Sequence, residues 1–551
     1  MNRRIFVITV IFSVTCLSSK AQVDKQVEVT KSYIPEIETA TKLSLEPDMV
    51  DTVRINPEID YSITPSSIQS TLSATLYKPA TVTYWEFNRP KQAYVKAGLG
   101  YPTSSVADVY ISNSNPNTNY IIGYLNHEGQ YAKLKNDNNE KLSALNSQNR
   151  VGVAAGLLFD KRALEGEFSY DVDAWSRYAS QNNVTPRPVY QTLAIGGRYG
   201  DDFIDFSRWN FDLDISANHM FNRTGDYNTS IGGGVKFGGN LWGGKLISDV
   251  GYDYIVGSGD YANNTLLIGT VYTFNTGSWD WGIGAKYYHD GVSLDEQRGC
   301  KNYVTPRFTL TNTNNRSFQP FIDVDGEFHR YNYAALVEEN PYTLEGEEMG
   351  RNNIEYILRG GIRGALGSGK FSYNIYINYT SSPNALYWSL FEVEHSTTNE
   401  YSNYYTAEQG RLQAFSVNGD FDYRPIGDMK LSFGGSATEY TTSDYVAAVL
   451  GREYANVYMG AEYTIRRVRF GATADLKGVS YTTLYRVSTT TTQETVQIPI
   501  TLNIKAFAEV TLKNDMVVFM NINNITNSNL YRWMGYREYG VNGMVGVKFQ
   551  F

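Results

Sequence analysis

The chain has 551 residues, with 48 Lys and Arg against 57 Asp and Glu, and a formal net charge of −9. This acidic balance argues against a nucleic-acid-binding protein, because such proteins need basic patches that neutralise phosphates. The chain contains 44 Tyr, 25 Phe and 8 Trp, and 42% of its residues are hydrophobic, which excludes a disordered chain.

Residues 1–21 have the three regions of a secretory signal peptide. Arg3 and Arg4 form a charged start, an apolar stretch follows, and Ala21 is the small residue before the expected cleavage site. Lipidation at Cys16 is the less favoured alternative, because the Thr before it is a poor small-residue position. The exported chain then has a net charge of −12 and one cysteine, Cys300, so we expect no internal disulfide.

Residues 22–90 are expected to form an extended periplasmic segment rather than a globular domain. This segment has few apolar runs and contains six prolines: Pro35, Pro47, Pro57, Pro65, Pro79 and Pro90. Proline fixes the backbone and removes a hydrogen-bond donor, which favours extended chain. Beyond residue 22 no stretch approaches the roughly 20 apolar residues of a membrane-spanning helix, which excludes an inner-membrane protein.

Residues 91–551 alternate between apolar and polar side chains, which predicts strands with one apolar face. The pattern is clear at residues 164–174, 209–218, 246–256, 371–379 and 468–476, and residues 496–512 read as one long strand. Soluble strands usually stop at about 10 residues or fewer. Long strands with one apolar face therefore indicate a different solvent on each side of the sheet.

The connections between these strands alternate between short and long. Short turns are expected at 160–162, 275–277, 314–315, 367–369, 426–428 and 513–515, and long loops near 129–148, 332–352, 383–410, 481–495 and 526–540. This is typical of a transmembrane antiparallel outer-membrane β-barrel with periplasmic turns and extracellular loops. We expect about 22 strands in an all-β fold, an even count that puts both termini of the barrel chain in the periplasm. We also expect Tyr-rich girdles where the wall meets water.

The last strand places its apolar side chains on one face and ends on an aromatic residue. Val545, Val547, Phe549 and Phe551 share that face, which resembles the C-terminal signal that the β-barrel assembly machinery recognises. Residues 516–531, together with this ending, resemble the final strands of TonB-dependent receptors, whose barrels have 22 strands. Such receptors also carry a plug domain, and the 69 residues of segment 22–90 are too few for one.

The N-terminal segment extends this resemblance. Residues 29–35, Val-Thr-Lys-Ser-Tyr-Ile-Pro, look like the start of plugless outer-membrane barrels from Bacteroidota. In TonB-dependent receptors a short strand here pairs with TonB, so Val27, Glu28, Val29 and Thr30 are candidates to add to a partner's sheet edge. The alternatives are that this segment lies in the barrel mouth or binds a periplasmic partner.

Acidic side chains fall on the polar face of the strands and predict the lining of the lumen. The candidates are Asp171, Asp173, Asp212, Asp214, Asp249, Asp253, Asp323 and Asp325. Acids dominate the first half of the barrel, and bases are expected mainly in the second. In an open pore such a lining favours cations, although a bound partner or inserted loops would neutralise it equally well.

One long loop is rich in aromatic residues. The expected extracellular loop 383–410 carries Tyr387, Trp388, Phe391, Tyr404 and Tyr405. Exposed aromatic side chains indicate a recognition surface, and a self-packed lid is the alternative.

No catalytic, metal or cofactor site emerges from the sequence. The five histidines have no zinc-ligand spacing, and the phosphate-loop mimic at residues 364–370 joins two strands, so it reads as a hairpin turn. His329 follows Asp323, Asp325 and Glu327 on one strand, which we interpret as lumen lining rather than a protease site. The acidic loop 338–348 reads as solvated rather than calcium-binding.

The sequence therefore predicts a non-enzymatic outer-membrane barrel with two alternative functions. It resembles a plugless TonB-dependent receptor that transports a small polar solute or acts as a pore. Alternatively it is a structural subunit of an envelope complex, such as an accessory barrel of the assembly machinery or a platform for surface lipoproteins. Its expected partners are membrane lipid, the assembly machinery, and TonB or other outer-membrane proteins and lipoproteins.

Overall fold

The computed structural model describes residues 92–113, 119–135, 141–159, 161–178, 187–294, 297–395, 400–442 and 451–551. Most of these residues lie in β-strands. The described part also contains one α-helix, α2 (Tyr333–Glu339), and one 3-10 turn, η1 (Lys513–Asp515). No helix in these ranges is long and apolar enough to cross a membrane. The predicted signal peptide, the segment 22–90 and the candidate pairing strand at Val27 to Thr30 lie outside the described residues.

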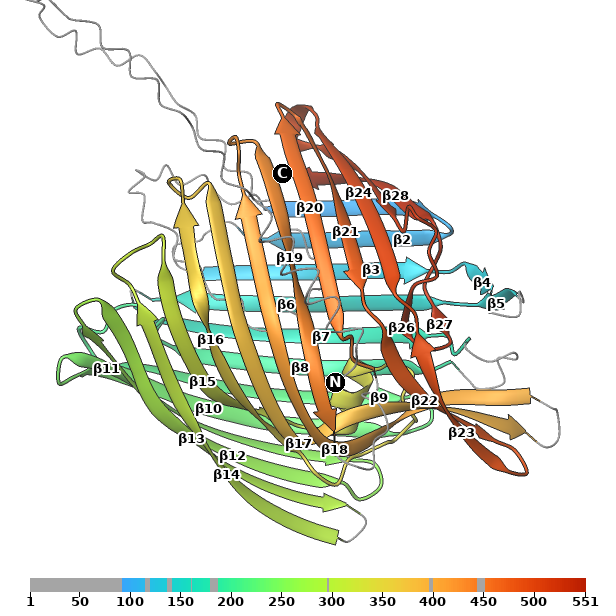
Figure 1. Ribbon diagram of the computed structural model, residues 1–551, viewed down its shortest axis with the longest axis horizontal. Helices are drawn as coiled ribbons and strands as arrows, with labels where there is room; N and C mark the ends of the chain where they lie inside the picture. The colour runs from blue at the N-terminus through green and yellow to red at the C-terminus, as the bar shows by residue number, and fades with distance from the viewer. Residues whose placement is uncertain are drawn as a thin grey trace, which may run out of the picture. The chain divides into compact units, whose positions relative to one another are not determined.

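Twenty-two strands form one closed antiparallel barrel (Figure 1), which confirms the predicted fold class. Each wall strand pairs with the next one along the ring, and β1 closes the ring by pairing with β28. The first eleven wall strands are β1 (Ala93–Tyr101), β2 (Ser104–Ser112), β3 (Asn119–Gln130), β6 (Asn146–Leu158), β7 (Ala163–Trp175), β8 (Val189–Gly200), β9 (Asn210–Asn222), β10 (Tyr227–Leu241), β11 (Gly244–Gly257), β12 (Ala262–Thr276) and β13 (Trp279–Leu294). The other eleven are β14 (Gln297–Asn312), β15 (Gln319–His329), β16 (Asn353–Leu366), β17 (Phe371–His395), β18 (Glu400–Tyr423), β19 (Met429–Thr442), β20 (Ala455–Ile465), β21 (Val468–Lys477), β24 (Thr501–Thr511), β25 (Val517–Asn523) and β28 (Asn542–Gln550).

Six further strands lie in the long connections between wall strands. They form three hairpins: β4 (Lys133–Lys135) with β5 (Lys141–Ser143), β22 (Ser480–Val487) with β23 (Thr491–Ile498), and β26 (Tyr531–Trp533) with β27 (Tyr536–Arg537). In addition, β22 pairs in parallel with the far end of β17.

The wall has an apolar outer face and a polar inner face because side chains alternate along each strand. On β9, Leu213 and Ile215 are exposed on the outer face and lie opposite Val235 and Gly233 of β10. Exposed apolar residues recur on the outer face around the ring: Leu99, Ile121, Val153, Ile195, Ile268, Ile283, Val304, Ile377, Val417, Met459 and Val545. An apolar band of this kind suits contact with lipid.

The two ends of the barrel differ in the length of their connections. At one end, here called the turn end, short connections join the strands at 159–162, 201–209, 242–243, 277–278, 313–318, 367–370, 424–428, 466–467 and 512–516. The other end, the loop end, carries the long connections and the three hairpins. The turn after Leu366 places Gly367, Ser368 and Gly369 at φ values of 59°, 59° and 88°, so the phosphate-loop mimic is a hairpin turn, as predicted.

Three boundary predictions were wrong. Residues 496–512 are two strands, β23 and β24, because Pro499 and Ile500 interrupt the run and proline has no N–H for a ladder bond. Residues 481–495 form most of the β22 and β23 hairpin instead of a loop. Residues 383–410 extend β17 and β18, which pair as far as His395 and Glu400.

Candidate functional site

The inner wall carries acidic side chains, and most of the predicted ones form ion pairs. Asp171 pairs with Arg150, and Asp212 accepts a 2.8 Å bond from Arg198 Nε. Arg198 also reaches Glu165 at 3.2 Å, so this one base bridges two acids on different strands. Further pairs join Asp253 to Arg330, Asp323 to Arg359, and Asp325 to Lys286.

The bases of the lining are not confined to the second half of the barrel. Arg150 and Arg198 lie in the first half of the barrel, on the same inner face as their acidic partners. In the second half, Arg469 pairs with Glu462 at 2.8 Å and with Glu509 at 3.4 Å. Cross-strand pairing thus neutralises much of the lining along the whole ring.

Three of the predicted lumen acids form no ion pair within the described part of the chain: Asp173, Asp214 and Asp249. Two of them lie over glycines of neighbouring strands. A Cβ on Gly234 would meet Asp214 Oδ1 at 2.8 Å, and a Cβ on Gly269 would meet Asp249 Oδ1 at 2.6 Å. Among the predicted lumen acids, three of eight therefore lack a paired counter-charge in the described residues.

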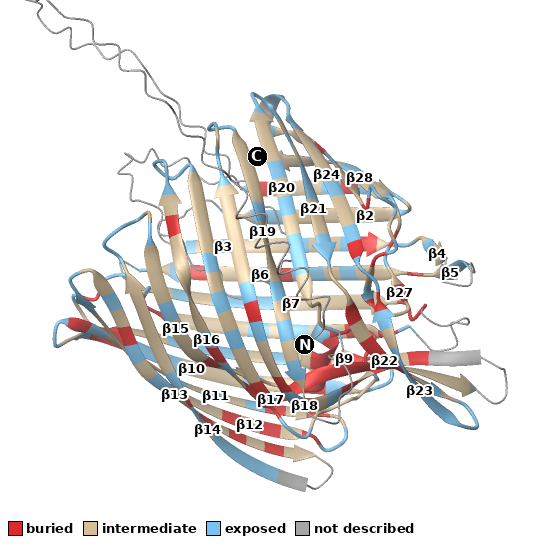
Figure 2. Ribbon diagram, in the orientation of Figure 1, coloured by how far each residue is buried: buried red, intermediate tan, exposed pale blue. Residues whose placement is uncertain are grey.

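At the loop end, long connections from separate parts of the ring pack into one aromatic cluster, here called the cap. Figure 2 shows buried residues gathered near β17, β22 and the C-terminal connection, while much of the wall is half-buried or exposed. The buried cap residues are Ala144, Tyr178, Tyr331, Leu336, Tyr342, Leu386, Trp388, Leu390, Tyr405, Ala407, Leu484, Trp533, Tyr536 and Tyr539.

Aromatic rings form the centre of the cap. The rings of Tyr342 and Tyr536 stack with centroids 3.5 Å apart. The ring of Trp533 lies 5.7 Å from that of Trp388 and 5.3 Å from that of Tyr405. Aromatic pairs at the distances of the two Trp533 contacts add about 0.5–1.5 kcal/mol each beyond their buried area. These rings hold three connections together.

Hydrogen bonds also join cap connections that start far apart on the ring. Arg177, just after β7, donates a 2.8 Å bond to the carbonyl of Thr343, which follows β15, the eighth strand beyond β7. Tyr178 donates a 2.7 Å bond to the carbonyl of Arg537, in the connection before β28. Since these segments leave the wall on different sides, the cap extends across the loop end rather than along one edge.

The helix α2 anchors the cap to the inner face of the wall. Tyr333 is fully buried and packs against Tyr190 and Met220 at the ends of β8 and β9. Its hydroxyl also bonds to the Asn222 side chain at 3.0 Å. The connection from β15 to β16 therefore turns inward.

Two neighbouring carboxyl groups join this connection to the rest of the cap. Glu347 accepts bonds from the Thr343 hydroxyl at 2.8 Å and the Ala407 backbone N–H at 3.0 Å. Glu348 accepts a 2.8 Å bond from the Tyr333 backbone N–H. Burial raises the pKa of Glu347 to about 7 and that of Glu348 to about 8, although these hydrogen bonds oppose the shift.

Two of the three remaining acids of the predicted loop 338–348 also bind groups of the chain itself. Glu339 accepts a 2.8 Å bond from Trp388 Nε1, and Glu345 lies 3.8 Å from Arg177. The expectation of a freely solvated acidic loop was wrong, because much of this segment is packed into the cap.

The predicted recognition residues lie in the extended β17 and β18 hairpin, and three of them are buried. Tyr387, Trp388 and Tyr405 are 0%, 2% and 1% exposed. Phe391 and Tyr404 are partly buried and stack on each other with centroids 5.8 Å apart. The prediction of an exposed recognition loop was therefore wrong, and the self-packed lid fits the structure.

The last strand lies where the ring closes. Val545 and Val547 are exposed on the outer face opposite Leu99 and Ala97, Phe549 lies opposite Val95, and the Phe551 backbone bonds to Ala93. These contacts locate the residues of the predicted assembly signal and leave its recognition as a prediction.

Of the buried cap residues, the sequence analysis named only Trp388 and Tyr405. Trp533, Tyr536 and Tyr539 lie in the predicted loop 526–540, whose aromatic density was visible in the sequence. Tyr178 and Tyr342 had no comparable pattern around them. Their role depends on contacts between connections, which the order of residues does not reveal.

Comparison with known proteins finds similarity at the level of the fold. No protein-family model matches the chain, and no curated protein matches it in sequence. Among solved structures, the FrpB iron transporter from Neisseria meningitidis is 11% identical with a TM-score of 0.67, covering 84% of this chain and 82% of that one.

Two further solved structures have the same barrel. The copper transporter OprC is 9% identical with a TM-score of 0.65, covering 84% of this chain and 83% of that one. The ferric-catecholate import receptor Fiu from E. coli K12 is 8% identical with a TM-score of 0.61, covering 84% and 82% of the two chains. The chain therefore has the fold of outer-membrane transporter barrels.

Proposed function

We propose that this chain is a non-enzymatic outer-membrane barrel that passes a small polar solute through its lumen, with the cap acting as a gate at the loop end. The observation that carries the proposal is the cap itself, which joins connections from separate parts of the ring above a polar inner wall. A polar lining holds water in the lumen. A movable cover at the loop end would control whether this water is continuous with the external medium.

The similarity to transporter barrels supports the same proposal. The named iron, copper and ferric-catecholate proteins are transporters or import receptors with this fold. In our proposal the loop end faces the outside and the turn end faces the periplasm, as in other outer-membrane barrels. The segment 22–90 then lies in the periplasm, where Val27 to Thr30 would add to the sheet edge of TonB or a related partner.

Planar-bilayer recording of the purified full chain tests this proposal. We expect low conductance for the unmodified protein and stable cation-selective currents for the variant Trp388→Ala/Tyr405→Ala, because both side chains are buried in the cap. Trp242→Ala is the matched control, since Trp242 is 90% exposed at the turn end. A cap variant that stays silent although its barrel is folded would contradict the gate.

A structural role in an envelope complex is the second candidate, and one observation favours it. The strand β23 pairs with β22 on one side, and its other edge has no strand partner within the described residues. An open edge is able to accept a strand from another protein. Stable co-purification of other outer-membrane proteins or lipoproteins, abolished by Gln493→Pro in β23, would favour this role over transport.

A further inference from the structure

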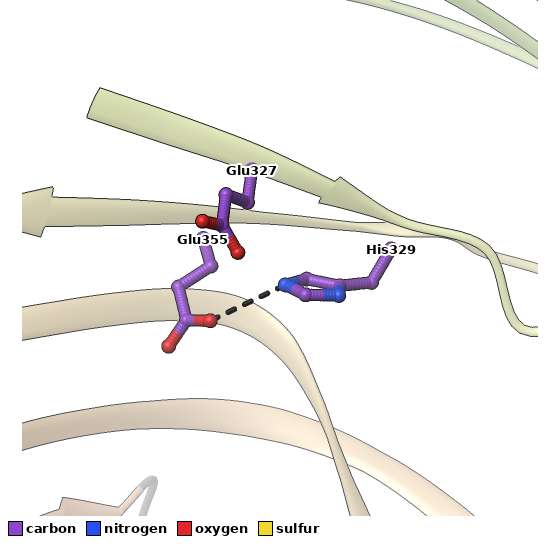
Figure 3. A group of neighbouring side chains, drawn as sticks. All are labelled: Glu327, His329 and Glu355. Carbon is purple, nitrogen blue, oxygen red and sulfur yellow. Dashed lines mark hydrogen bonds and ion pairs between the residues drawn. The ribbon is translucent and has the colours of Figure 1, made fainter. Parts of the chain in front are cut away.

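Glu327, His329 and Glu355 form a cluster on the inner face where β15 and β16 meet the cap connection (Figure 3). Glu327 lies directly opposite Glu355 in the strand register, and His329 is two residues further along on the same face. One ligand atom from each residue lies within 4.8 Å of the other two. His329 Nε2 and Glu355 Oε2 are 3.2 Å apart.

Glu327 and Glu355 are two acids that face each other across the strand pair. Like charges directly opposite each other destabilise a strand pair. The Glu327 carboxylate has no hydrogen bond or ion pair with any residue that the structure describes. Arg452 adds a positive charge near His329 and Glu355, but it forms no ion pair with either carboxylate in the described part of the chain.

The neighbouring acids differ from Glu327 in this respect. On the same face of β15, Asp325 lies 2.7 Å from Lys286 Nζ, and Asp323 lies 3.7 Å from Arg359 Nη1. Each of these acids has a basic partner on another strand. Of the three inward-facing acids of β15, Glu327 is the one without a basic partner among the described residues.

We propose that Glu327, His329 and Glu355 bind a divalent first-row transition-metal ion such as Zn²⁺. One imidazole nitrogen and two carboxylate oxygens suit such an ion, whereas calcium and magnesium prefer oxygen ligands alone. Two carboxylates and a neutral imidazole carry two negative charges, which a divalent ion balances.

The geometry needs only a small adjustment to hold the ion. Zinc bonds of about 2.0–2.2 Å place their ligand atoms roughly 3–4 Å apart, so modest side-chain rotation closes the present spacing. The strand register fixes the backbone of all three residues, and water completes the coordination sphere.

The ion would lie at the base of the cap connection. His329 ends β15, and the next residue, Arg330, pairs with Asp253 of β11. The Tyr331 backbone N–H then bonds to the Asn352 side chain at 3.0 Å. An ion at this site fixes the point at which the connection leaves the wall. Binding of the ion does not depend on whether the barrel transports a solute.

Titration of Zn²⁺ into the full chain tests the site directly. The protein is purified in detergent without a histidine tag, stripped with EDTA, and followed by isothermal titration calorimetry. We expect one zinc ion per chain. The zinc affinity of Glu327→Gln should be weaker by at least about 10–100-fold, because the loss of a direct ligand should cost at least as much as the loss of a residue that orients a ligand. Binding should also weaken as the pH falls, because protons compete with the metal ion for its ligands.

Asp325→Asn is the matched control, because Asp325 lies on the same face of the same strand and pairs with Lys286. This variant should keep wild-type zinc affinity. The heat-dependent gel mobility of folded barrels shows whether each variant is folded, and the visible absorption of Co²⁺ in the wild-type chain gives a second readout. Absence of stoichiometric zinc binding in the wild type, or equal affinity in the two variants, would overturn the proposal.

Discussion

The two ends of the barrel are built from different kinds of contact. At the turn end a short connection closes within its own hairpin, as at residues 367–370, or also binds the adjacent turn, as Asp201 does with Arg162. At the loop end the connections bind one another across the ring, as in the stacked rings of Tyr342 and Tyr536.

This difference indicates how each end should respond to change. Loss of a contact at the turn end should weaken the wall locally, because the strands that it joins are already neighbours. Loss of a central contact in the cap should loosen segments that are not neighbours in the wall. The cap is therefore the part of the described structure best suited to open while the wall remains intact.

The largest effect is expected from removing the central ring of the cap. Tyr536→Ala should cost about 3–5 kcal/mol of cap stability, because it leaves a cavity at a site that is 2% exposed. We expect limited proteolysis to cleave the connections 330–352 and 524–541 at least about 10-fold faster, with unchanged heat-dependent gel mobility of the barrel. Equal cleavage of the variant and the wild type would show that the cap does not act as a unit.

A smaller and different effect is expected at the turn end. Asp201 is fully buried and accepts bonds from Arg208 at 2.7 Å and the Phe211 backbone N–H at 3.0 Å. Asp201→Asn should cost about 1–3 kcal/mol, because its basic partners lose their counter-charge. The temperature at which the folded barrel loses its gel mobility should fall, while proteolysis of the cap stays unchanged. Asp202→Asn, at an exposed neighbouring residue, is the control. Faster cleavage of the cap in Asp201→Asn would contradict the idea that the two ends respond independently.

A pH-dependent opening of the cap should follow from Glu347 and Glu348. Their pKa values are raised to about 7 and about 8 in the closed cap, so the closed state binds more protons than an open, solvated one. Closure should therefore be favoured at low pH and weaken as pH rises from about 4.5 through 8. Proteolysis of residues 330–352 should accelerate between pH 6 and pH 8.5, and Glu347→Gln/Glu348→Gln should flatten this dependence. A wild-type rate that is flat with pH, after correction for protease activity, would contradict this account.

The smallest effect is expected from one unpaired acid of the inner wall. Asp214→Asn in the Trp388→Ala/Tyr405→Ala background should lower the preference for cations modestly, because Asp214 forms no ion pair in the described part of the chain. Reversal potentials in a salt gradient measure this change. Asp205→Asn, in the turn 201–209, should leave selectivity unchanged, and an equal shift in both variants would argue against a local effect.

The wall and the turn end were largely predictable from the sequence, because they follow from local patterns. Alternation locates the strands, as at Leu213 and Ile215, and Gly367 with Gly369 marks a tight turn. The break at Pro499 was missed because the apolar alternation continues across it. Proline has no N–H for a ladder bond, and this property predicts a strand break more strongly than the alternation predicts continuity.

The cap and the metal site could not be derived in the same way. Tyr178 and Arg537 are 359 residues apart in the chain and meet only because their connections cross the ring. Glu355 joins Glu327 and His329 through a register that depends on the length of the intervening connection. The sequence prediction placed the lumen bases mainly in the second half of the barrel and did not include Arg150 and Arg198, which pair with Asp171 and Asp212.

A reversible lock on the cap tests the central claim most directly. Tyr342→Cys and Tyr536→Cys, introduced together with Cys300→Ser, place two thiols where stacked rings now meet, and a short bifunctional thiol reagent cleaved by reduction can join them. Planar-bilayer recording of one sample before and after reduction should show low conductance when linked and higher, cation-selective conductance when released. Identical currents in the two states would show that the cap does not gate the lumen.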